Sequence, residues 1–333
     1  MLNNTYLESK LTQRSIIDHE TAAKFVNSLD TFLQEMTEEK ENLGTTEVVD
    51  VLSLLITLRD YFSCTSEWED LVYVCLTRIR DNIYSKKYSF PAAFSGLAYV
   101  AFITRELANV APDLKPFLRS IETLLCHDVH RYCNPHDINA FHSTNSYELI
   151  SGMSGMLKYF LEQHTDSRFK NTLHELVEAF IARSCAKQIC GHTLPGWHYY
   201  PSTYERKYME TPALNGCVNY GVSHGMGGPL AVLSQAYARN INTEMLLPII
   251  TDLISEYMNS YYYRDSSIHW PGRITFEEYV DILPRRQPRT RNRWCYGSAG
   301  ILRALYIAAK SISETSIETF ALEELEKISQ EET

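Results

Sequence analysis

The sequence lacks the features that would insert the protein into a membrane or bind it to nucleic acid. No apolar run among its 333 residues approaches the roughly 18 residues that a membrane-spanning helix needs. Its N-terminus lacks the basic and apolar regions of a secretory signal peptide. The net charge is −10 and no basic stripe offsets it, which argues against nucleic acid or an anionic membrane as a partner. We therefore expect a cytoplasmic protein with no transmembrane segment.

Disulfide bonds are not expected either. The chain has eight cysteines, and it shows no sign of secretion. Cysteines in an unsecreted chain are usually buried thiols or metal ligands rather than disulfide partners.

Long alternating strand patterns are scarce, and helical periodicity dominates instead. Apolar residues recur at spacings of three and four, which is typical of amphipathic helices. The predicted helices are Glu20–Met36, Val48–Phe62, Trp68–Ile83, Leu97–Leu107, Phe117–Cys126, Gly155–Gln163, Thr172–Ser184, Leu230–Ala238 and Met245–Tyr257, with a final charged helix in Ser311–Thr333. Two irregular stretches, 188–221 and 261–293, are expected to form long loops over a site. We predict one all-α domain over residues 1–333.

Four turns of glycine and small residues each open an apolar helix. Their leading glycines are Gly96, Gly152, Gly225 and Gly297, separated by 56, 73 and 72 residues. Each interval has room for one or more helical hairpins. Equivalent turns at such wide spacing predict a closed or curved array of hairpins, with the turns gathered at one end.

The fourth turn carries a cysteine at the start of a helix. Cys295 stands two residues before Gly297, and Arg291 lies one turn earlier. A thiol there would meet helix N–H groups and a guanidinium, both of which favour the thiolate. A thiolate is the form that binds zinc or attacks carbon.

Several motifs together resemble the lanthionine cyclases, which close thioether rings in lantibiotic peptides. The segment 294–297, Trp-Cys-Tyr-Gly, resembles a zinc-site segment of that family, and 223–230 resembles its histidine loop. The segment 219–221 leads into this loop as expected, and the loop signatures 194–197 and 270–272 match as well. The resemblance runs from about residue 85 to 330, and its motifs are specific in combination.

The resemblance implies an α/α toroid, a barrel of helical hairpins, with a central zinc ion. In that family a peptide cysteine adds to a dehydroalanine or dehydrobutyrine, forming a lanthionine or methyllanthionine ring. The resemblance also implies a role for each matching residue. Cys295 is expected to be a zinc ligand, His224 the acid–base group, Arg291 an electrostatic or orienting residue, and Tyr296 a residue that lines the site. A histidine suits the proton exchange that an enolate intermediate requires.

The resemblance also implies partners. They are a dehydrated precursor peptide as substrate, and a lantibiotic dehydratase and an export transporter as further components. The expected location is cytoplasmic, peripheral to a membrane-associated biosynthetic complex.

The sequence departs from the family pattern at two places. Glu148 stands where the family has an aspartate; it keeps the carboxylate that would orient His224 but reaches one methylene further. The second departure concerns a downstream Cys-His-Gly motif, which supplies two further zinc ligands in the family and does not occur in this chain.

The missing motif leads to expectations about activity. The chain ends 38 residues after Cys295, so we expect a toroid that lacks its final hairpins, as a truncated product or as a fragment of a longer protein. Zinc in a catalytic site usually has three protein ligands, so we expect zinc binding to be weak or absent and cyclisation to be impaired. The alternative is a non-catalytic peptide-binding or scaffolding relic of the family.

Plainer interpretations stay open. Cys295 is also compatible with a small buried hydrophobic residue, and His224 with a helix cap, although the motifs favour the functional roles. Glu148 can simply complement a helix dipole, and Arg291 can be solvated or paired with an acidic neighbour. An unrelated α/α-barrel glycosidase would need two carboxylates facing each other across a cleft, whereas only Glu148 lies near a glycine turn. The run of cysteines and histidines at 126–136 matches no standard zinc spacing.

Overall fold

The computed structural model describes residues 2–13, 18–38, 44–62, 65–88, 91–94, 96–133, 143–207, 209, 213–288 and 293–331. The chain forms two compact units. Unit 1 comprises Met1–Ser89 and Ser95–Glu122, and unit 2 comprises Phe90–Phe94 and Thr123–Thr333. The single domain expected over 1–333 stays a prediction.

Unit 1 is helical and has its own apolar core. Its helices are α1 (Asn4–Gln13), α2 (His19–Glu38), α3 (Thr45–Leu58), α4 (Thr65–Tyr84) and α5 (Leu97–Val110), and α6 (Lys115–Tyr132) begins in it. Helix α3 packs on α4 and α5, burying Val48, Leu52 and Leu55 at helical spacing. The buried indole of Trp68 donates a hydrogen bond of 2.8 Å to the carbonyl of Leu55.

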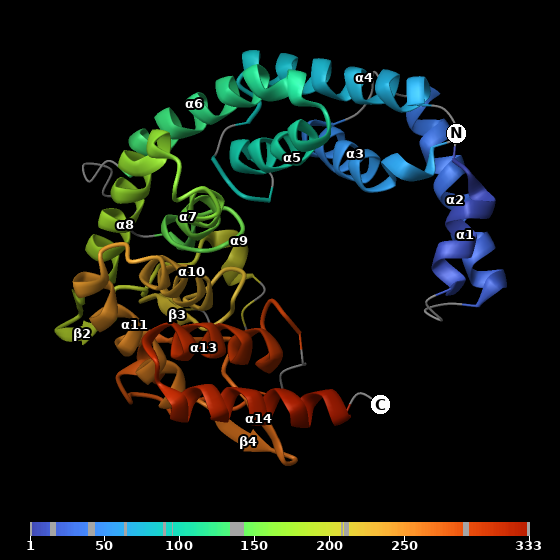
Figure 1. Cartoon of the computed structure of the whole chain (residues 1–333). Coiled ribbons are helices and arrows are strands. Elements are labelled where there is room, and N and C mark those ends of the chain that lie inside the picture. The colour runs from blue at the N-terminus through green and yellow to red at the C-terminus, as the bar shows by residue number, and fades with distance from the viewer. Residues whose placement is uncertain are drawn as a thin grey trace. The chain divides into compact units, whose positions relative to one another are not determined.

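Unit 2 is also mainly helical. After α6 it contains α7 (Met153–Leu161), α8 (Lys170–Ser184), α9 (Thr203–Arg206), α10 (Gly227–Ala238), α11 (Thr243–Met258), α12 (Phe276–Tyr279), α13 (Ser298–Ile312) and α14 (Thr315–Glu331). Helix α10 is buried along most of its length and packs against α7, α11 and α13, and α14 lies along α13 (Figure 1). Pro229 falls in the first turn of α10, where its missing N–H has no partner to lose. The predicted helices are thus present, and the mainly α fold class is confirmed.

The two irregular stretches hold short strands that the sequence did not reveal. In the described ranges these are β1 (Lys187–Ile189), β2 (His192–Leu194), β3 (Cys217–Asn219), β4 (Tyr262–Arg264), β5 (Ser267–His269) and β6 (Arg273–Thr275). They pair antiparallel as β1–β2, β3–β6 and β4–β5. Each strand has only three residues, too few to show alternating hydrophobicity. The β3–β6 pair joins the two irregular stretches.

The four predicted glycine turns do begin helices. Gly96, Gly152 and Gly297 are the N-cap residues of α5, α7 and α13, and all three are extended, with φ between −111° and −120°. The third turn enters α10 at Gly227, two residues after Gly225. The sequence pattern therefore located the starts of four helices.

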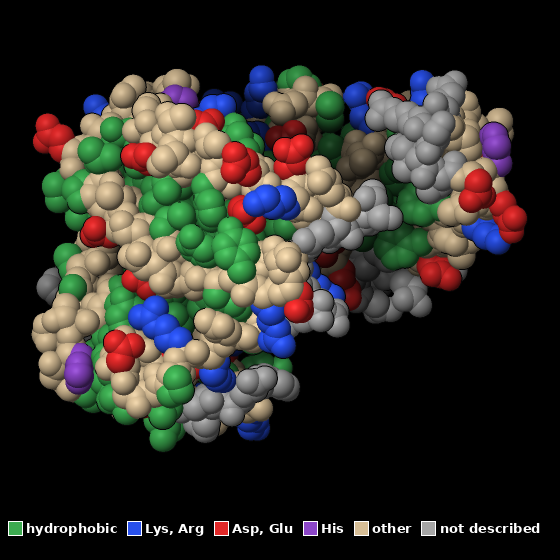
Figure 2. Space-filling model, turned by 90° about the horizontal axis from the view of Figure 1, so that it is seen from below, with side chains coloured by type: hydrophobic (Ala, Val, Ile, Leu, Met, Phe, Trp, Pro, Cys, Tyr) green, Lys and Arg blue, Asp and Glu red, His purple; other side chains and the backbone are tan. Residues whose placement is uncertain are grey.

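On the face drawn in Figure 2, acidic and basic side chains are interspersed among the described residues and do not gather into a basic stripe. None of the described helices is long and apolar enough to cross a membrane.

Candidate active site

Three of the glycine turns meet in unit 2. The backbone N–H of Leu149, before α7, donates to the carbonyl of Ser223, before α10, at 3.0 Å. The N–H of Val222 in turn donates to the carbonyl of Cys295, before α13, at 2.9 Å. Main-chain hydrogen bonds therefore connect the segments that carry Glu148, His224 and Cys295.

Gly221 allows two of these segments to lie in contact. A Cβ at this position would lie 2.6 Å from Cε1 of Tyr296 and 2.9 Å from the carbonyl oxygen of Cys295. Both distances are far below van der Waals contact, so a larger residue would separate the histidine loop from the cysteine turn.

Glu148 is a fully buried carboxylate, and both of its oxygens take part in hydrogen bonds. Its Oε2 accepts from the N–H of Ile150 at 2.9 Å, and its Oε1 accepts from the N–H of Ser151. Oε2 also lies 2.8 Å from Nδ1 of His224. Burying a carboxylate is costly unless such donors surround it, and this carboxylate has three.

His224 combines a buried partner with an exposed face. Its side chain is 46% exposed, whereas that of Glu148 is 0% exposed. A carboxylate only accepts hydrogen bonds, so Nδ1 of His224 donates the proton in this contact. The other ring nitrogen, Nε2, is left for proton exchange with a bound molecule, which is the arrangement of an oriented acid–base histidine.

Tyr296 lies next to His224. The centroids of the two rings are 6.5 Å apart and their planes are inclined by 34°. The phenol accepts a hydrogen bond of 3.1 Å from Nδ2 of Asn219, and the guanidinium carbon of Arg273 lies 5.8 Å from the ring centroid. Burial raises the pKa of the Tyr296 phenol; the hydrogen bond from Asn219 and the charge of Arg273 limit that rise. The side chain is therefore a neutral phenol at neutral pH.

The predicted residues fall into two groups. The structure brings Glu148, His224 and Tyr296 together and places the backbone of Cys295 beside the histidine loop, with the Cys295 side chain half-buried. Arg291 lies outside the described residues. The roles assigned to these residues remain proposals.

Sequence reasoning missed Arg273 and did not recognise the function of Asn219. The two residues face each other in the β3–β6 pair, and both contact Tyr296. Asn219 stands in a stretch that resembles the family, but nothing in the sequence indicated that its amide bonds a tyrosine 77 residues away.

The described donor set does not fit the zinc site that the family resemblance implies. Within the described ranges no group of three or more His, Cys, Asp and Glu side chains is arranged to hold a metal ion. A catalytic zinc usually has three protein ligands.

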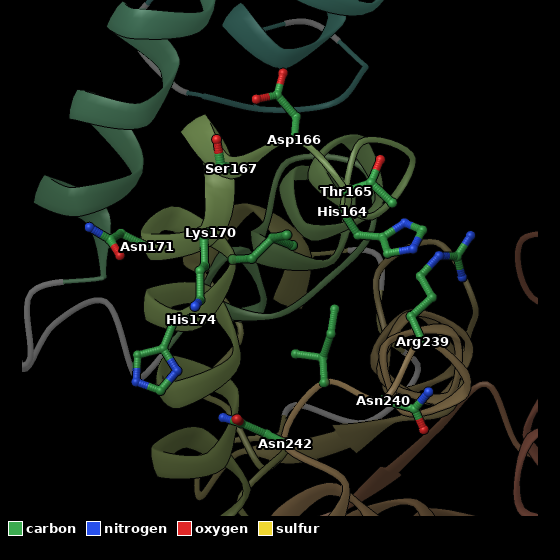
Figure 3. Close-up of a pocket in the computed structure, with 12 residues that line it drawn as sticks. His164, Thr165, Asp166, Ser167, Lys170, Asn171, His174, Arg239, Asn240 and Asn242 are labelled. Atoms are coloured by element: carbon green, nitrogen blue, oxygen red, sulfur yellow. The ribbon is translucent and has the colours of Figure 1, made fainter.

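A cavity of about 620 Å³ lies elsewhere in unit 2. It is lined by the α7–α8 and α10–α11 connections, at the opposite ends of α7 and α10 from the glycine turns. Figure 3 shows His164 and Arg239 on one side and Lys170 and His174 on the other.

Several of the charged side chains around this cavity lie in ion pairs. Asp166 is held by Arg168 at 2.7 Å, Glu162 lies 3.7 Å from Arg239, and Glu178 lies 4.0 Å from His174. None of the predicted site residues lines the cavity. It is therefore separate from the candidate active site.

Comparison with a family model decides the affiliation of the chain. The model described as "Lanthionine synthetase C-like protein" matches residues 51–333. The chain belongs to the lanthionine synthetase C-like family. The resemblance carried by the cysteine and histidine motifs is thereby confirmed.

Two further comparisons agree with this family. Nisin biosynthesis protein NisC of Lactococcus lactis subsp. lactis is 25% identical over 218 residues. The solved structure of a nisin cyclase matches with a TM-score of 0.77 and 17% identity, covering 92% of this chain and 76% of that one. At this identity the structural match shows the fold alone, and it confirms the predicted α/α toroid.

The alignment with NisC covers only part of each protein. It includes 62% of this chain and 49% of NisC. The match thus spans about half the length of this curated relative.

Proposed function

We propose that this protein acts in lantibiotic biosynthesis, adding cysteine thiols of a dehydrated precursor peptide to dehydroalanine or dehydrobutyrine. The observation that carries the proposal is the contact of 2.8 Å between Nδ1 of His224 and Oε2 of the buried Glu148. Membership of the lanthionine synthetase C-like family supports the choice of reaction.

The first step is removal of a proton from the peptide thiol. Nε2 of His224 accepts this proton, and the ring becomes an imidazolium. The Glu148 carboxylate stabilises the imidazolium through Nδ1, because opposite charges in contact within a protein interact more strongly than in water. The peptide sulfur is then a thiolate.

The second step forms the ring. The thiolate adds to the β-carbon of the dehydro residue, a carbon–sulfur bond forms, and the alkene electron pair moves onto the enolate. Nε2 of the imidazolium then delivers its proton to the α-carbon. This transfer closes the thioether and returns His224 to its starting form, so atoms and charge balance over the cycle.

Tyr296 provides a fixed wall beside the reacting histidine. Because its phenol is neutral and hydrogen-bonded to Asn219, it does not compete with the thiolate as a nucleophile. Its ring, 6.5 Å from that of His224, limits where the alkene can lie.

The reaction also requires other proteins before and after it. A dehydratase must supply the dehydro residues, and an export transporter would remove the finished peptide. We infer both partners from the reactions or transport steps that must precede and follow ring closure. We place the protein in the cytoplasm, peripheral to a membrane-associated complex of these enzymes.

A second candidate is a non-catalytic protein that binds the precursor peptide. It is favoured by the donor set, since the described residues provide no three-ligand metal cluster. In this case His224 and Glu148 would contribute to peptide binding alone.

Substitution of His224 separates the two candidates. Wild-type protein is incubated with dehydrated precursor, and the remaining thiols are counted by alkylation and mass spectrometry. We expect H224A to close rings at least about 100-fold more slowly, the usual contribution of a general acid–base group. The matched control is H174A, which removes an exposed histidine of α8. Ring closure by wild type that is no faster than without protein would favour the binding role. Equal, accelerated rates for H224A and wild type would favour another acid–base group.

A further inference from the structure

Arg273 is a cationic side chain that the proposed reaction does not use. It lies in β6, and its side chain is 29% exposed. Its Nε donates to the hydroxyl of Tyr199 at 3.0 Å, and Nη2 lies 4.0 Å from Oε1 of Glu205. The guanidinium also lies over the Tyr296 ring, 5.8 Å from its centroid. Arg273 thus connects the strand region to the tyrosine beside His224.

The strand pair gives this contact a rigid base. Asn219 stands opposite Arg273 in the β3–β6 register. The buried amide of Asn219 is used at both ends, because Oδ1 accepts from the N–H of Gly221 at 2.9 Å while Nδ2 donates to Tyr296 at 3.1 Å. Its oxygen and its nitrogen can therefore not exchange places without losing a bond.

The ring of Tyr296 is thereby restrained on three sides. Asn219 holds the hydroxyl, Arg273 covers the ring, and the backbone of Gly221 lies against its edge. A cation over a tyrosine ring within about 6 Å is attracted by the ring quadrupole, most strongly when partly desolvated.

We propose that Arg273 is a positioning residue of the cyclase site, which together with Asn219 holds the Tyr296 phenol beside His224. The inference rests on the proposed function for its catalytic consequence, whereas the positioning itself is independent of turnover. Arg273 is expected to affect the reaction only by holding Tyr296 in place.

The charge of Arg273 is permanent at working pH. Burial lowers the pKa of its guanidinium, but the nearby Tyr199 and Tyr296 more than offset this, and the pKa lies above its usual value. The same charge lowers the pKa of Tyr296, against the larger effect of burial. Removing the guanidinium should therefore raise the pKa of Tyr296 further and release its ring.

A fluorine label on Tyr296 tests this directly. With 3-fluorotyrosine at position 296, the ¹⁹F resonance reports the position and titration of this one ring. We expect R273M to shift the resonance and raise the pKa of the label, and R273K to change both in the same direction by less. The matched control is R303M, which removes a guanidinium 5.4 Å from the Tyr306 ring on α13 and should leave the label unchanged.

Kinetics then give the catalytic consequence. We expect R273M to lower kcat of ring closure about 10- to 100-fold, with little change in KM, because a small displacement of a site group affects the transition state most. Circular dichroism checks that R273M is folded; if it is not, the smaller effects of R273K decide the question.

The possible results test the positioning role, the catalytic consequence and the proposed function separately. A label that behaves alike in wild type, R273M and R273K overturns the positioning role. An unchanged kcat in a folded R273M whose label has shifted overturns the catalytic consequence. If the wild-type protein closes no rings, the proposed function fails, while the ¹⁹F titration still decides what Arg273 does to Tyr296.

Discussion

The N-cap glycines of α5 and α7 have nearly the same backbone conformation, but the residues before them differ in chemistry. The φ and ψ angles are −116° and −163° at Gly96, and −111° and −171° at Gly152. Four residues before the glycine, the α5 turn has Ala92 and the α7 turn has Glu148, and both are buried. The glycine therefore has a structural role at the start of the helix. The side chain before the glycine determines the chemistry that each turn can carry out.

The other two turns extend this comparison. His224 stands one residue before Gly225, and Cys295 stands two before Gly297. Each turn of unit 2 thus presents a different ionisable group, and hydrogen bonds between the turns bring these segments together. The three glycine turns of unit 2 therefore carry three different side chains, Glu148, His224 and Cys295.

The largest expected effect on activity comes from giving the α7 turn the residue found at the same place in the α5 turn. We expect E148A to slow ring closure about 100- to 1,000-fold, because His224 loses the group that orients its ring and stabilises its charged form. Loss of an acceptor for two backbone N–H groups should also cost about 1–3 kcal/mol of unfolding free energy. Thiol alkylation and urea denaturation measure the two effects.

The control keeps the carboxylate. E148D has the shorter acidic side chain, and we expect it to retain most of the activity that E148A loses. Equal loss in both variants would mean that the site needs the length of Glu148 rather than its charge. Full activity in E148A would show that the Glu148 carboxylate does not give the α7 turn a function that the α5 turn lacks.

At the α13 turn, which carries Cys295, the expected property is weak zinc binding. After dialysis the chain is expected to hold well under one zinc ion per chain, because a tight catalytic site needs about three protein ligands. Metal analysis by mass spectrometry gives the occupancy, and C295A is the matched control. One tightly held zinc that disappears in C295A would show that further ligands join Cys295.

The last prediction concerns two cations at the junction of α8 and β1, Arg183 and Lys187. Nε of the buried Arg183 donates to Oγ of Ser146 at 2.9 Å, and its guanidinium carbon lies 4.9 Å from the Tyr147 ring centroid. Burial, and then the charge of Arg183, lowers the pKa of Lys187 to about 7. The folded protein therefore gives up this proton at a lower pH than the unfolded chain does.

The sign of the resulting pH dependence follows from linkage. Between pH about 7 and the higher pKa of an unfolded lysine, the unfolded state binds more protons, so stability rises with pH. We expect the unfolding free energy of wild type, measured relative to K187M, to increase from pH 7 to pH 10. Urea denaturation at several pH values checks this, and a flat difference would contradict the lowered pKa.

Helices and turns were largely predictable from the sequence. The predicted segment Thr172–Ser184 is observed as Lys170–Ser184, because apolar residues at helical spacing determine its buried face. The helix starts were marked by glycines whose lack of a side chain permits close packing of the turns. Helix α1 was missed, since its sequence shows little periodicity.

Contacts between distant segments were predictable only in part. The approach of Glu148 to His224 was expected from the family resemblance, and the structure places them 2.8 Å apart. The contact of Arg273 with Tyr296 depends on the pairing of two strands of three residues each, which carry no local signal. Such contacts are set by tertiary packing, which spacing along the chain does not reveal.

The central claim is that His224, held by Glu148, moves the proton during thiol addition. The most direct measurement is ring closure of a dehydrated precursor in D₂O by wild type and by H224A. We predict that wild type consumes the free thiols and places one deuterium on the α-carbon of each new thioether, while H224A leaves the thiols free over the same time. Closure by H224A at the wild-type rate, with the same deuterium content, would contradict the claim.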